Sequence, residues 1–458
     1  MTLTREDPAL ARPVEDESQL IEFFRSGEKP PEKWRIGTEH EKVGLYQDTL
    51  QTIPYEGERG IRALLAELER EHGFSPLLDA GRLVGLERDG TSITLEPGGQ
   101  LELSGAPLAT LHETCREFHD HLALMKHCSE HFGMVWLGLG IHPLASVNEL
   151  PRMPRERYTI MREYLDKRGS HALEMMHGTG SVQVNLDYGS EADLARKLRV
   201  ALAASPVVTA LYANSSISRG KPNGMISRRA WVWRHTDPQR TGLLPFVFDE
   251  RWDEDHAYSG YLEWALDVPM LFILREDRHL PMQGRSFRDY LANGHERYRA
   301  TLADWNLHLT TLFPEVRLKQ VVEMRSADAV PPGLVCALPA FWTGLLYDED
   351  ALAAAWARLR PWRFEDVDRL QEEVARVGLD AQTPDGPMHV LAKELVDLAA
   401  RGLQSLARRN RAGEDERLFL DPLYEILDRG TSPGRYLLEC WEGAWDRRTD
   451  LLVEYSKY

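Results

Sequence analysis

The chain has 458 residues, of which 43% are hydrophobic and 28% charged, and its formal net charge is −17. This composition is typical of a globular protein whose core is large enough to fold without disulfides. The strong negative charge argues against nucleic acid or an anionic membrane surface as the binding partner. We therefore expect no nucleic-acid partner and no membrane partner.

The N-terminus lacks the basic region and the apolar run of a secretory signal. Two long uncharged stretches, 200–218 and 329–347, contain prolines and are typical of buried core rather than of lipid-facing helices. Four cysteines in a chain of this length indicate a reducing compartment. Cys115 and Cys128 share one helical pattern and lie too far apart along it to form a disulfide. Together these features predict a cytoplasmic protein.

In chain order, the polar segment 1–16 is expected to be a flexible arm, and a mixture of helices and strands follows it. The patterns predict a helix over 17–25, a strand over 36–42, a helix over 58–72, a hairpin with strands 92–96 and 100–104, a helix over 106–132, and strands over 134–141 and 181–187. After a helix over 191–213 they predict a basic loop over 219–242, strands within 261–275 and 305–328, and helices from about 348 to the end.

Hairpins and helices follow one another without the regular strand–helix alternation of a parallel sheet. This order favours the α+β class with a mainly antiparallel sheet. The apolar strand faces would pack on helices, and the polar face would form the floor of a cavity. No linker is visible, so we expect one domain over 17–458, with a mostly helical part from about 348.

Carboxylates and amides recur at every second position in several predicted strands. Because residues i and i+2 of a strand point to the same face, each strand contributes a polar row. The rows are Glu39 and Glu41; Gln100, Glu102 and Ser104; Ser181, Gln183, Asn185 and Asp187; and Glu323 with Arg325. Carboxylates gathered on one face repel one another unless a cation lies between them, and Mg²⁺ or a magnesium nucleotide would fit. The alternative is a solvated sheet face, which four such strands together make less favourable because acids are disfavoured within strands.

A basic segment, 218–242, contains six Arg or Lys residues, including Arg234 and Arg240, against one acid. It could bind phosphates or a carboxylate, or it could be a solvated surface loop. Arg325 could likewise form a structural ion pair with Glu323 or stabilise charge on a transferring phosphoryl group. The chain has no Gly-x-x-x-x-Gly-Lys-Ser/Thr loop, no Gly-x-Ser-x-Gly elbow and no His-Glu-x-x-His motif.

Five long segments resemble plant-type glutamate–cysteine ligase, a type also found in bacteria. They are 36–42 (IGTEHEK), 95–107 (LEPGGQLELSGAP), 181–188 (SVQVNLDY), 310–319 (TTLFPEVRLK) and 337–348 (ALPAFWTGLLYD). The resemblance runs from about residue 17 to the C-terminus and implies a glutamine-synthetase-like fold, a curved antiparallel sheet that forms a funnel backed by helices. It also implies a reaction in which ATP phosphorylates the γ-carboxylate of glutamate and the cysteine amine attacks the acyl phosphate. The products would be γ-glutamylcysteine, ADP and phosphate, in the first step of glutathione biosynthesis.

The resemblance also assigns roles to individual residues. It implies Mg²⁺ or Mn²⁺ ligation by Glu39, Glu41, Glu96, Glu102, Gln183 and Glu323. It implies that Arg325, with Glu323, acts at the transferring phosphoryl group, that Asn185 contacts substrate, and that Arg234 and Arg240 bind phosphate or the α-carboxylate of glutamate. ATP would be a co-substrate, and the protein would be a monomer or a homodimer.

Three other functions stay open on the residues alone. The first is a related ligase with a different amine acceptor, because nothing in the sequence defines the acceptor pocket. The second is a divalent-metal phosphotransferase or hydrolase that uses the same carboxylates. The third is a non-catalytic, acidic metal-binding protein.

Overall fold

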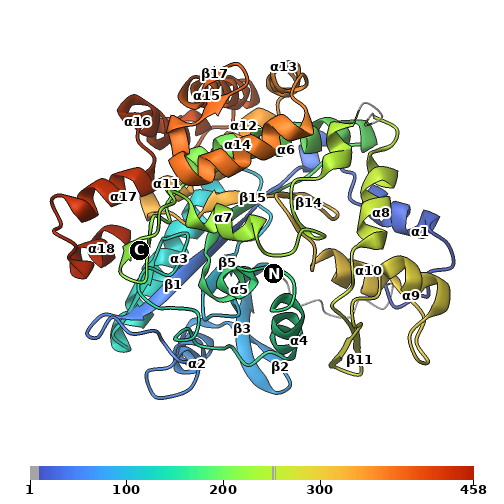
Figure 1. Cartoon of the computed structure of the whole chain (residues 1–458), viewed down its shortest axis with the longest axis horizontal. Coiled ribbons are helices and arrows are strands. Elements are labelled where there is room, and N and C mark those ends of the chain that lie inside the picture. Colours follow the sequence, from blue (N-terminus) through green and yellow to red (C-terminus); the bar gives the residue numbers. More distant parts are fainter. Residues whose placement is uncertain (1–9, 250–251, 253) are drawn as a thin grey trace.

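An antiparallel sheet of nine strands forms the centre of the part of the chain that the structure describes (Figure 1). The structure is a computed structural model, and it describes residues 10–249, 252 and 254–458. Most of the expected arm over 1–16, namely residues 1–9, lies outside the described residues. The strands of the sheet are β1 (Ile36–Tyr46), β2 (Ser75–Asp79), β3 (Arg82–Arg88), β4 (Thr91–Leu95), β5 (Leu101–Ser104), β6 (Met134–Leu137), β7 (Ser181–Leu186), β14 (Val316–Leu318) and β15 (Val322–Asp328).

The strand order is β14-β15-β7-β1-β5-β4-β3-β2, with β6 paired to the far end of β1. Every pairing in this sheet is antiparallel. The sheet is not closed, since β14 and β2 are its edges. The predicted α+β class with a mainly antiparallel sheet backed by helices is therefore confirmed.

Helices follow and flank these strands. Those before residue 320 are α1 (Ser18–Arg25), α2 (Ile61–His72), α3 (Leu111–His131), α4 (Glu156–Leu165), α5 (Ala172–Gly178), α6 (Glu191–Tyr212), α7 (Arg228–Arg234), α8 (Ala257–Asp267), α9 (Phe287–Asn293) and α10 (Leu302–Leu309). Later ones are α11 (Pro332–Val335), α12 (Ala337–Leu346), α13 (Glu349–Leu359), α14 (Phe364–Val377), α15 (Met388–Leu406), α16 (Asp421–Arg429), α17 (Pro433–Glu442) and α18 (Thr449–Ser456).

The remaining elements are short. They are the strands β8 (Ile217–Ser218), β9 (Lys221–Pro222), β10 (Thr241–Gly242), β11 (Phe272–Arg275), β12 (Arg278–Pro281), β13 (Phe313–Pro314), β16 (Gln382–Thr383) and β17 (Gly386–Pro387), and the 3₁₀ turns η1 (Pro31–Lys33), η2 (Pro245–Phe248), η3 (Gly378–Asp380) and η4 (Glu416–Leu420).

The two faces of the sheet have different surroundings. The alternating apolar residues of β7, Val182, Val184 and Leu186, are fully buried in the main core, to which α6 and α12 also contribute. The orange and red C-terminal helices gather on one side of the molecule, while α8, α9 and α10 lie with α1 on another (Figure 1). The polar residues of β7 and its neighbours face α4, α5 and α7 instead, so the strand alternation separates core from cavity.

Most predicted elements occur within a few residues of their expected places. The helix expected over 17–25 is α1, the hairpin is β4 with β5, and the helix over 191–213 is α6. The single-domain arrangement stays a prediction, although in the described residues after 332 the only strands are β16 and β17.

One expectation was wrong. The basic segment expected to be a loop contains α7, whose N-cap Ser227 accepts a hydrogen bond from the Ala230 N–H. The strands expected within 261–275 and 305–328 occur as β11 and as β13, β14 and β15, each after a helix that takes up the first part of the range.

Cys115 and Cys128 both lie on α3 and are free thiols, as expected from their spacing. Cys336, which looks isolated in the sequence, instead hydrogen-bonds to Cys115, and this contact together with burial raises the pKa of the Cys115 thiol. Within the described residues, no helix has the length and the apolar character needed to cross a membrane.

Candidate active site

Side chains from four neighbouring strands form polar rows across the sheet. In one row Arg317 of β14 faces Glu323 of β15, which in turn faces Asn185 of β7. In the next, Gln183 of β7 faces Glu39 of β1. Glu41 of β1 lies opposite Glu102 of β5. Cationic groups therefore lie at the β14–β15 side of this face and carboxylates at the β1–β5 side.

These rows form the floor of a cavity of about 70 Å³. Six of the predicted site residues line it: Glu39, Glu41, Glu96, Glu102, Gln183 and Arg325. They come from distant segments of the chain, since Glu39 and Arg325 are 286 residues apart in the sequence. The sheet register is what brings them together.

Glu41 and Glu102 are direct cross-strand partners on β1 and β5. Like charges in this position destabilise a sheet. Each carboxylate is held by hydroxyl or amide donors: Oε2 of Glu41 accepts from Ser181 N at 2.6 Å and Oγ at 2.9 Å, and Oε2 of Glu102 accepts from Thr94 Oγ1 at 2.7 Å. These donors orient the two carboxylates without neutralising them.

Glu96 and Gln100 flank the tight turn between β4 and β5. Gln100 fixes the turn, because its Oε1 accepts from Gly98 N at 2.8 Å and its Nε2 donates to Thr179 O at 2.9 Å. A Cβ at Gly98 would lie 1.9 Å from the carbonyl oxygen of His177, so only glycine allows this close approach. The turn thereby places Glu96 beside Glu102 at the carboxylate end of the cavity.

Glu323 is enclosed by arginines. Nη2 of Arg317 lies 2.7 and 2.8 Å from its two carboxylate oxygens, and Nη1 of Arg325 donates to Oε1. Glu323 is fully buried and does not line the cavity, whereas Arg325 does. With both oxygens taken by guanidinium groups, Glu323 serves in this structure as the counter-ion that gathers Arg317 and Arg325.

Arg325 reaches the cavity from its cationic end. Its Nη1 donates to Gln183 Oε1 at 2.6 Å, and its guanidinium lies 5.7 Å from the Trp233 ring centre and 5.9 Å from that of Phe313. Asn185 is one row away and donates from Nδ2 to Glu39 Oε1 at 3.1 Å. Asn185 therefore touches the site through Glu39.

An apolar wall faces this polar floor. It consists of residues from α4, α5, α7 and β13 that the sequence analysis did not single out, namely Tyr158, Met161, Met175, Met176, Trp233 and Phe313. No single-strand periodicity indicates them, since helix packing alone brings them over the sheet. Methionine side chains are flexible, so this wall can adapt to a ligand.

Burial and mutual repulsion shift three of the carboxylates, Glu39, Glu41 and Glu96, toward their protonated forms. Burial acts on Glu102 in the same direction, but its pKa is lowered overall, and the hydrogen bond from Thr94 contributes to this. Burial, with a contribution from Glu102, raises the pKa of Glu41 to about 7. Burial together with Glu102 and Glu41 raises the pKa of Glu96 to about 8. Burial also raises the pKa of Glu39, with Glu323 adding to the effect. Such a group of acids binds either protons or cations.

The donor set suits a hard divalent cation. Carboxylate and carboxamide oxygens are the ligands that Mg²⁺ and Mn²⁺ take, and a cation would relieve the repulsion that helps to raise the pKa values of Glu41 and Glu96. The oxygens are not preassembled around a point, since nowhere in the described part of the chain do three His, Cys, Asp or Glu side chains gather closely enough to hold a metal. Repulsion between ionised carboxylates would keep them apart until a cation arrives.

Sequence comparison relates the chain to a known family. The profile described as "Glutamate-cysteine ligase family 2(GCS2)" matches residues 35–453. A glutamate–cysteine ligase of Medicago truncatula is 42% identical over 99% of this chain and 87% of its own length, and one of Nicotiana tabacum is 43% identical over 99% and 85%. The chain belongs to glutamate–cysteine ligase family 2.

Among solved structures, a glutamate–cysteine ligase of Francisella tularensis superposes with a TM-score of 0.55 at 14% identity. The match covers 92% of this chain and 87% of that one. At this identity the likeness shows the fold alone.

The relatives correct one expectation. The glutamate–cysteine ligases of Medicago truncatula, Nicotiana tabacum, Oryza sativa and Arabidopsis thaliana that match this chain are named chloroplastic. They contradict the prediction of a cytoplasmic protein. The lack of a secretory signal does not exclude an organelle, and reducing conditions do not distinguish the cytoplasm from an organelle.

Two residues that the family resemblance suggested for substrate binding lie elsewhere. Arg240 is fully buried, and its guanidinium donates to Asp237, to Thr311 O and to Pro269 O. Arg234 forms a two-point ion pair with Asp368 of α14, at 2.7 and 3.2 Å. Neither lines the cavity.

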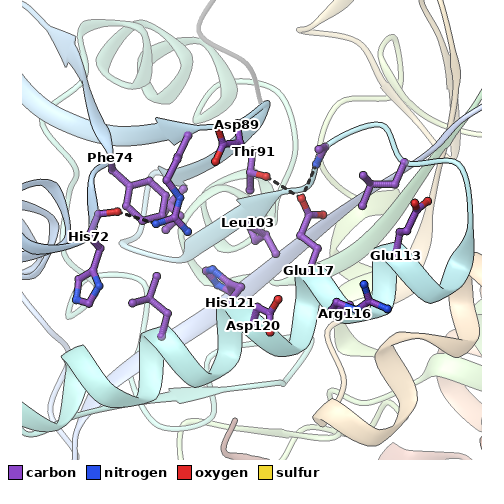
Figure 2. A pocket seen from close by; sticks show the side chains of 15 residues that line it. His72, Phe74, Asp89, Thr91, Leu103, Glu113, Arg116, Glu117, Asp120 and His121 are labelled. Atoms are coloured by element: carbon purple, nitrogen blue, oxygen red, sulfur yellow. Dashed lines mark hydrogen bonds between the residues drawn. The ribbon is translucent and has the colours of Figure 1, made fainter. Parts of the chain in front are cut away.

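A second, larger cavity of about 530 Å³ lies between α3 and strands β3 to β5, away from the carboxylate rows (Figure 2). It contains none of the predicted site residues. Several of its polar groups already have partners: Glu117 Oε1 accepts from Thr91 Oγ1 at 2.7 Å and from Ala106 N at 3.0 Å, and Arg88 donates to His72 O. We therefore place the chemistry in the smaller cavity.

Proposed function

We propose that this protein joins the γ-carboxylate of glutamate to the amine of cysteine with ATP, through a γ-glutamyl phosphate. Membership of glutamate–cysteine ligase family 2 supports the reaction. The observation that assigns the reaction to this site is the separation of charge on the cavity floor. Glu41 and Glu102 lie opposite each other at one end, and Arg325 lies at the other. Phosphoryl transfer between two anions needs cations on both sides of the reacting group.

Glu39, Glu41, Glu96 and Glu102 are the residues that would hold Mg²⁺ or Mn²⁺. The amide oxygen of Gln183 would join them through its second lone pair, since the first accepts from Arg325 Nη1. The metal would neutralise phosphate oxygens and so allow ATP to approach the glutamate carboxylate. Glu323, which the resemblance also named as a ligand, has no part in our assignment because Arg317 and Arg325 occupy both of its oxygens.

Arg325 is the group that we assign to the transferring phosphoryl. Its planar guanidinium can hold two phosphate oxygens at once, and Gln183, Trp233 and Phe313 limit its motion. Asn185 would orient Glu39 through its hydrogen bond to that carboxylate, and it would lie next to the substrate. The Francisella structure named above was solved in complex with AMP, which supports a nucleotide site in this fold.

The apolar wall would complete the site. At about 70 Å³ the cavity is smaller than the roughly 300 Å³ and more that ligands of this size occupy, so binding requires the wall to move. Met161, Met175 and Met176 have the rotational freedom for such movement. Closure over the substrates would then exclude water from the acyl phosphate.

The test is product identification with purified protein, ATP, Mg²⁺, glutamate and a panel of amines. We expect γ-glutamylcysteine and ADP in equal amounts, with cysteine as the preferred acceptor. ADP formed without any amino acid would indicate a phosphohydrolase instead. Preference for another amine would indicate a related ligase.

A further inference from the structure

Arg325 lies in a β-bulge. On β15, Met324 pairs with Val184 of β7 and Ala327 pairs with Val182, so Arg325 and Ser326 together oppose one residue, Gln183. A bulge of this kind bends the strand and redirects a side chain. Met324 and Ala327, which would lie on opposite faces of a regular strand, both enter the main core.

Side chains from outside the sheet hold the backbone of the bulge. Nη2 of Arg229 donates to Arg325 O at 2.7 Å, and Thr209 Oγ1 donates to Ser326 O at 3.2 Å. On the β14 side, Arg325 N donates to Glu315 O at 3.0 Å. A bulge leaves ladder groups unpaired, and buried backbone groups need partners. These contacts provide them.

Arg229 is itself immobilised at the start of α7. It is 4% exposed, its N–H donates to Ser215 Oγ at 3.0 Å, and its Nη1 lies 3.9 Å from Asp328 Oδ1. Asp328 accepts from Ser215 Oγ at 2.6 Å and from Ser227 Oγ, the N-cap of α7, at 2.8 Å. The helix start, the end of β15 and the bulge therefore form one buried network.

We propose that Arg229 is a positioning residue that sets the direction of Arg325 by holding the carbonyl of the bulge. The proposal rests on the assigned role of Arg325 at the phosphoryl group. Thr209 supports the same bulge from α6, and it receives a hydrogen bond from Gln371 Nε2 at 3.0 Å. A loosened bulge would let the Arg325 guanidinium drift from the phosphate without removing any group that touches substrate.

Arg229→Met is expected to lower kcat on the order of 10²-fold, the typical cost of a reacting group misplaced by about 1 Å, with little change in the KM for ATP. Arg229→Lys should recover part of the loss, since it keeps the charge and one donor. Thr209→Val, which alters no charge, should lower kcat less. The matched control is Arg199→Met: Arg199 is 5% exposed and also donates to backbone carbonyls, Trp362 O at 2.5 Å and Arg360 O at 3.3 Å, away from the cavity.

The deciding experiment is a double-mutant cycle of Arg229→Met with Arg325→Lys, with γ-glutamylcysteine formation and thermal melts measured for each protein. If Arg229 acts through Arg325, Arg229→Met should lower kcat by a much smaller factor in the Arg325→Lys background than in the wild type. Fully additive losses, or an Arg229→Met enzyme as active as the Arg199→Met control, would overturn the proposal. A wild-type protein without ligase activity would instead refute the proposed function.

Discussion

Arg317 and Glu323 face each other directly across β14 and β15, with two contacts of 2.7 and 2.8 Å between one guanidinium nitrogen and both carboxylate oxygens. Nη1 of Arg317 also donates to Thr310 O and Leu312 O, each at 3.1 Å. The pair is a fixed element of the site floor, and Arg325 extends from it toward the cavity. The cationic end of the site is therefore preorganised by ion pairs, whereas at the other end carboxylates lie beside one another.

Substituting Arg325 with lysine tests the assigned phosphoryl contact. Lysine keeps the positive charge but loses the planar fork, so kcat should fall on the order of 10²-fold or more while the KM for ATP changes less. Steady-state kinetics with a coupled ADP assay measure both. Near-wild-type kcat would show that Arg325 serves only as a partner of Glu323.

Glu323→Gln should weaken the fold rather than metal binding alone. It leaves Arg317 without its buried partner, and breaking such a pair costs about 3–5 kcal/mol of unfolding free energy. Urea unfolding of the wild type and the variant measures this loss. A wild-type midpoint combined with a large rise in the Mg²⁺ requirement would instead restore Glu323 to the metal ligands.

Acid should remove the contribution of Glu323 to stability. Burial alone would raise its pKa, but Arg317, Lys319 and Arg325 outweigh burial and hold it well below the ordinary value of 4.5. A carboxylate with a depressed folded pKa stabilises the protein above its unfolded pKa, and the effect is lost as pH falls from there through the folded value. The stability difference between wild type and Glu323→Gln should therefore shrink below about pH 4.5. A difference that stays constant down to pH 3 would contradict this origin.

The carboxylate end should show the opposite dependence on pH. The pKa values of Glu41 and Glu96, about 7 and about 8, lie above the ordinary 4.5. Between the ordinary value and these raised values, the folded, metal-free protein binds more protons than the unfolded chain. Its stability should then decrease as pH rises from about 5 to 8, and Mg²⁺ should restore it increasingly. Melting temperatures at several pH values, in EDTA and in Mg²⁺, test this. A Mg²⁺-induced shift that does not grow with pH would count against these carboxylates as the binding groups.

Removing one member of the opposed pair should separate stability from function. Glu41→Gln relieves the repulsion by Glu102 across β1 and β5, so the variant should melt higher than wild type in EDTA. It should also lose most ligase activity, because one charged ligand is gone. A variant that is both less stable in EDTA and fully active would contradict both parts of the assignment.

Much of the site could be predicted because strand alternation is local. The i, i+2 spacing was enough to anticipate that Glu39 and Glu41 share a face, and the same holds for Gln183 and Asn185. Register was not predictable, since nothing near Glu323 in the sequence indicates that Arg317 lies directly opposite it. The bulge at Arg325 depends likewise on contacts from Arg229 and Thr209, which are about 100 residues away or more.

Helix packing accounts for the rest of what the sequence analysis missed. Trp233, Met175 and Met176 reach the cavity only because α5 and α7 lie over the polar strand face. Arg240 appeared exposed in a basic segment, yet Asp237 and two backbone carbonyls enclose its guanidinium. A run of charged residues does not reveal which of them turn inward.

The most direct test of the central claim is a mass-spectrometric assay of products formed from ATP, Mg²⁺, glutamate and cysteine, run beside the same mixture with excess EDTA. We predict γ-glutamylcysteine and ADP in a one-to-one ratio, and neither product in EDTA. ADP without the peptide, or full turnover in EDTA, would contradict a ligase in which Glu39, Glu41, Glu96 and Glu102 hold a divalent cation beside Arg325.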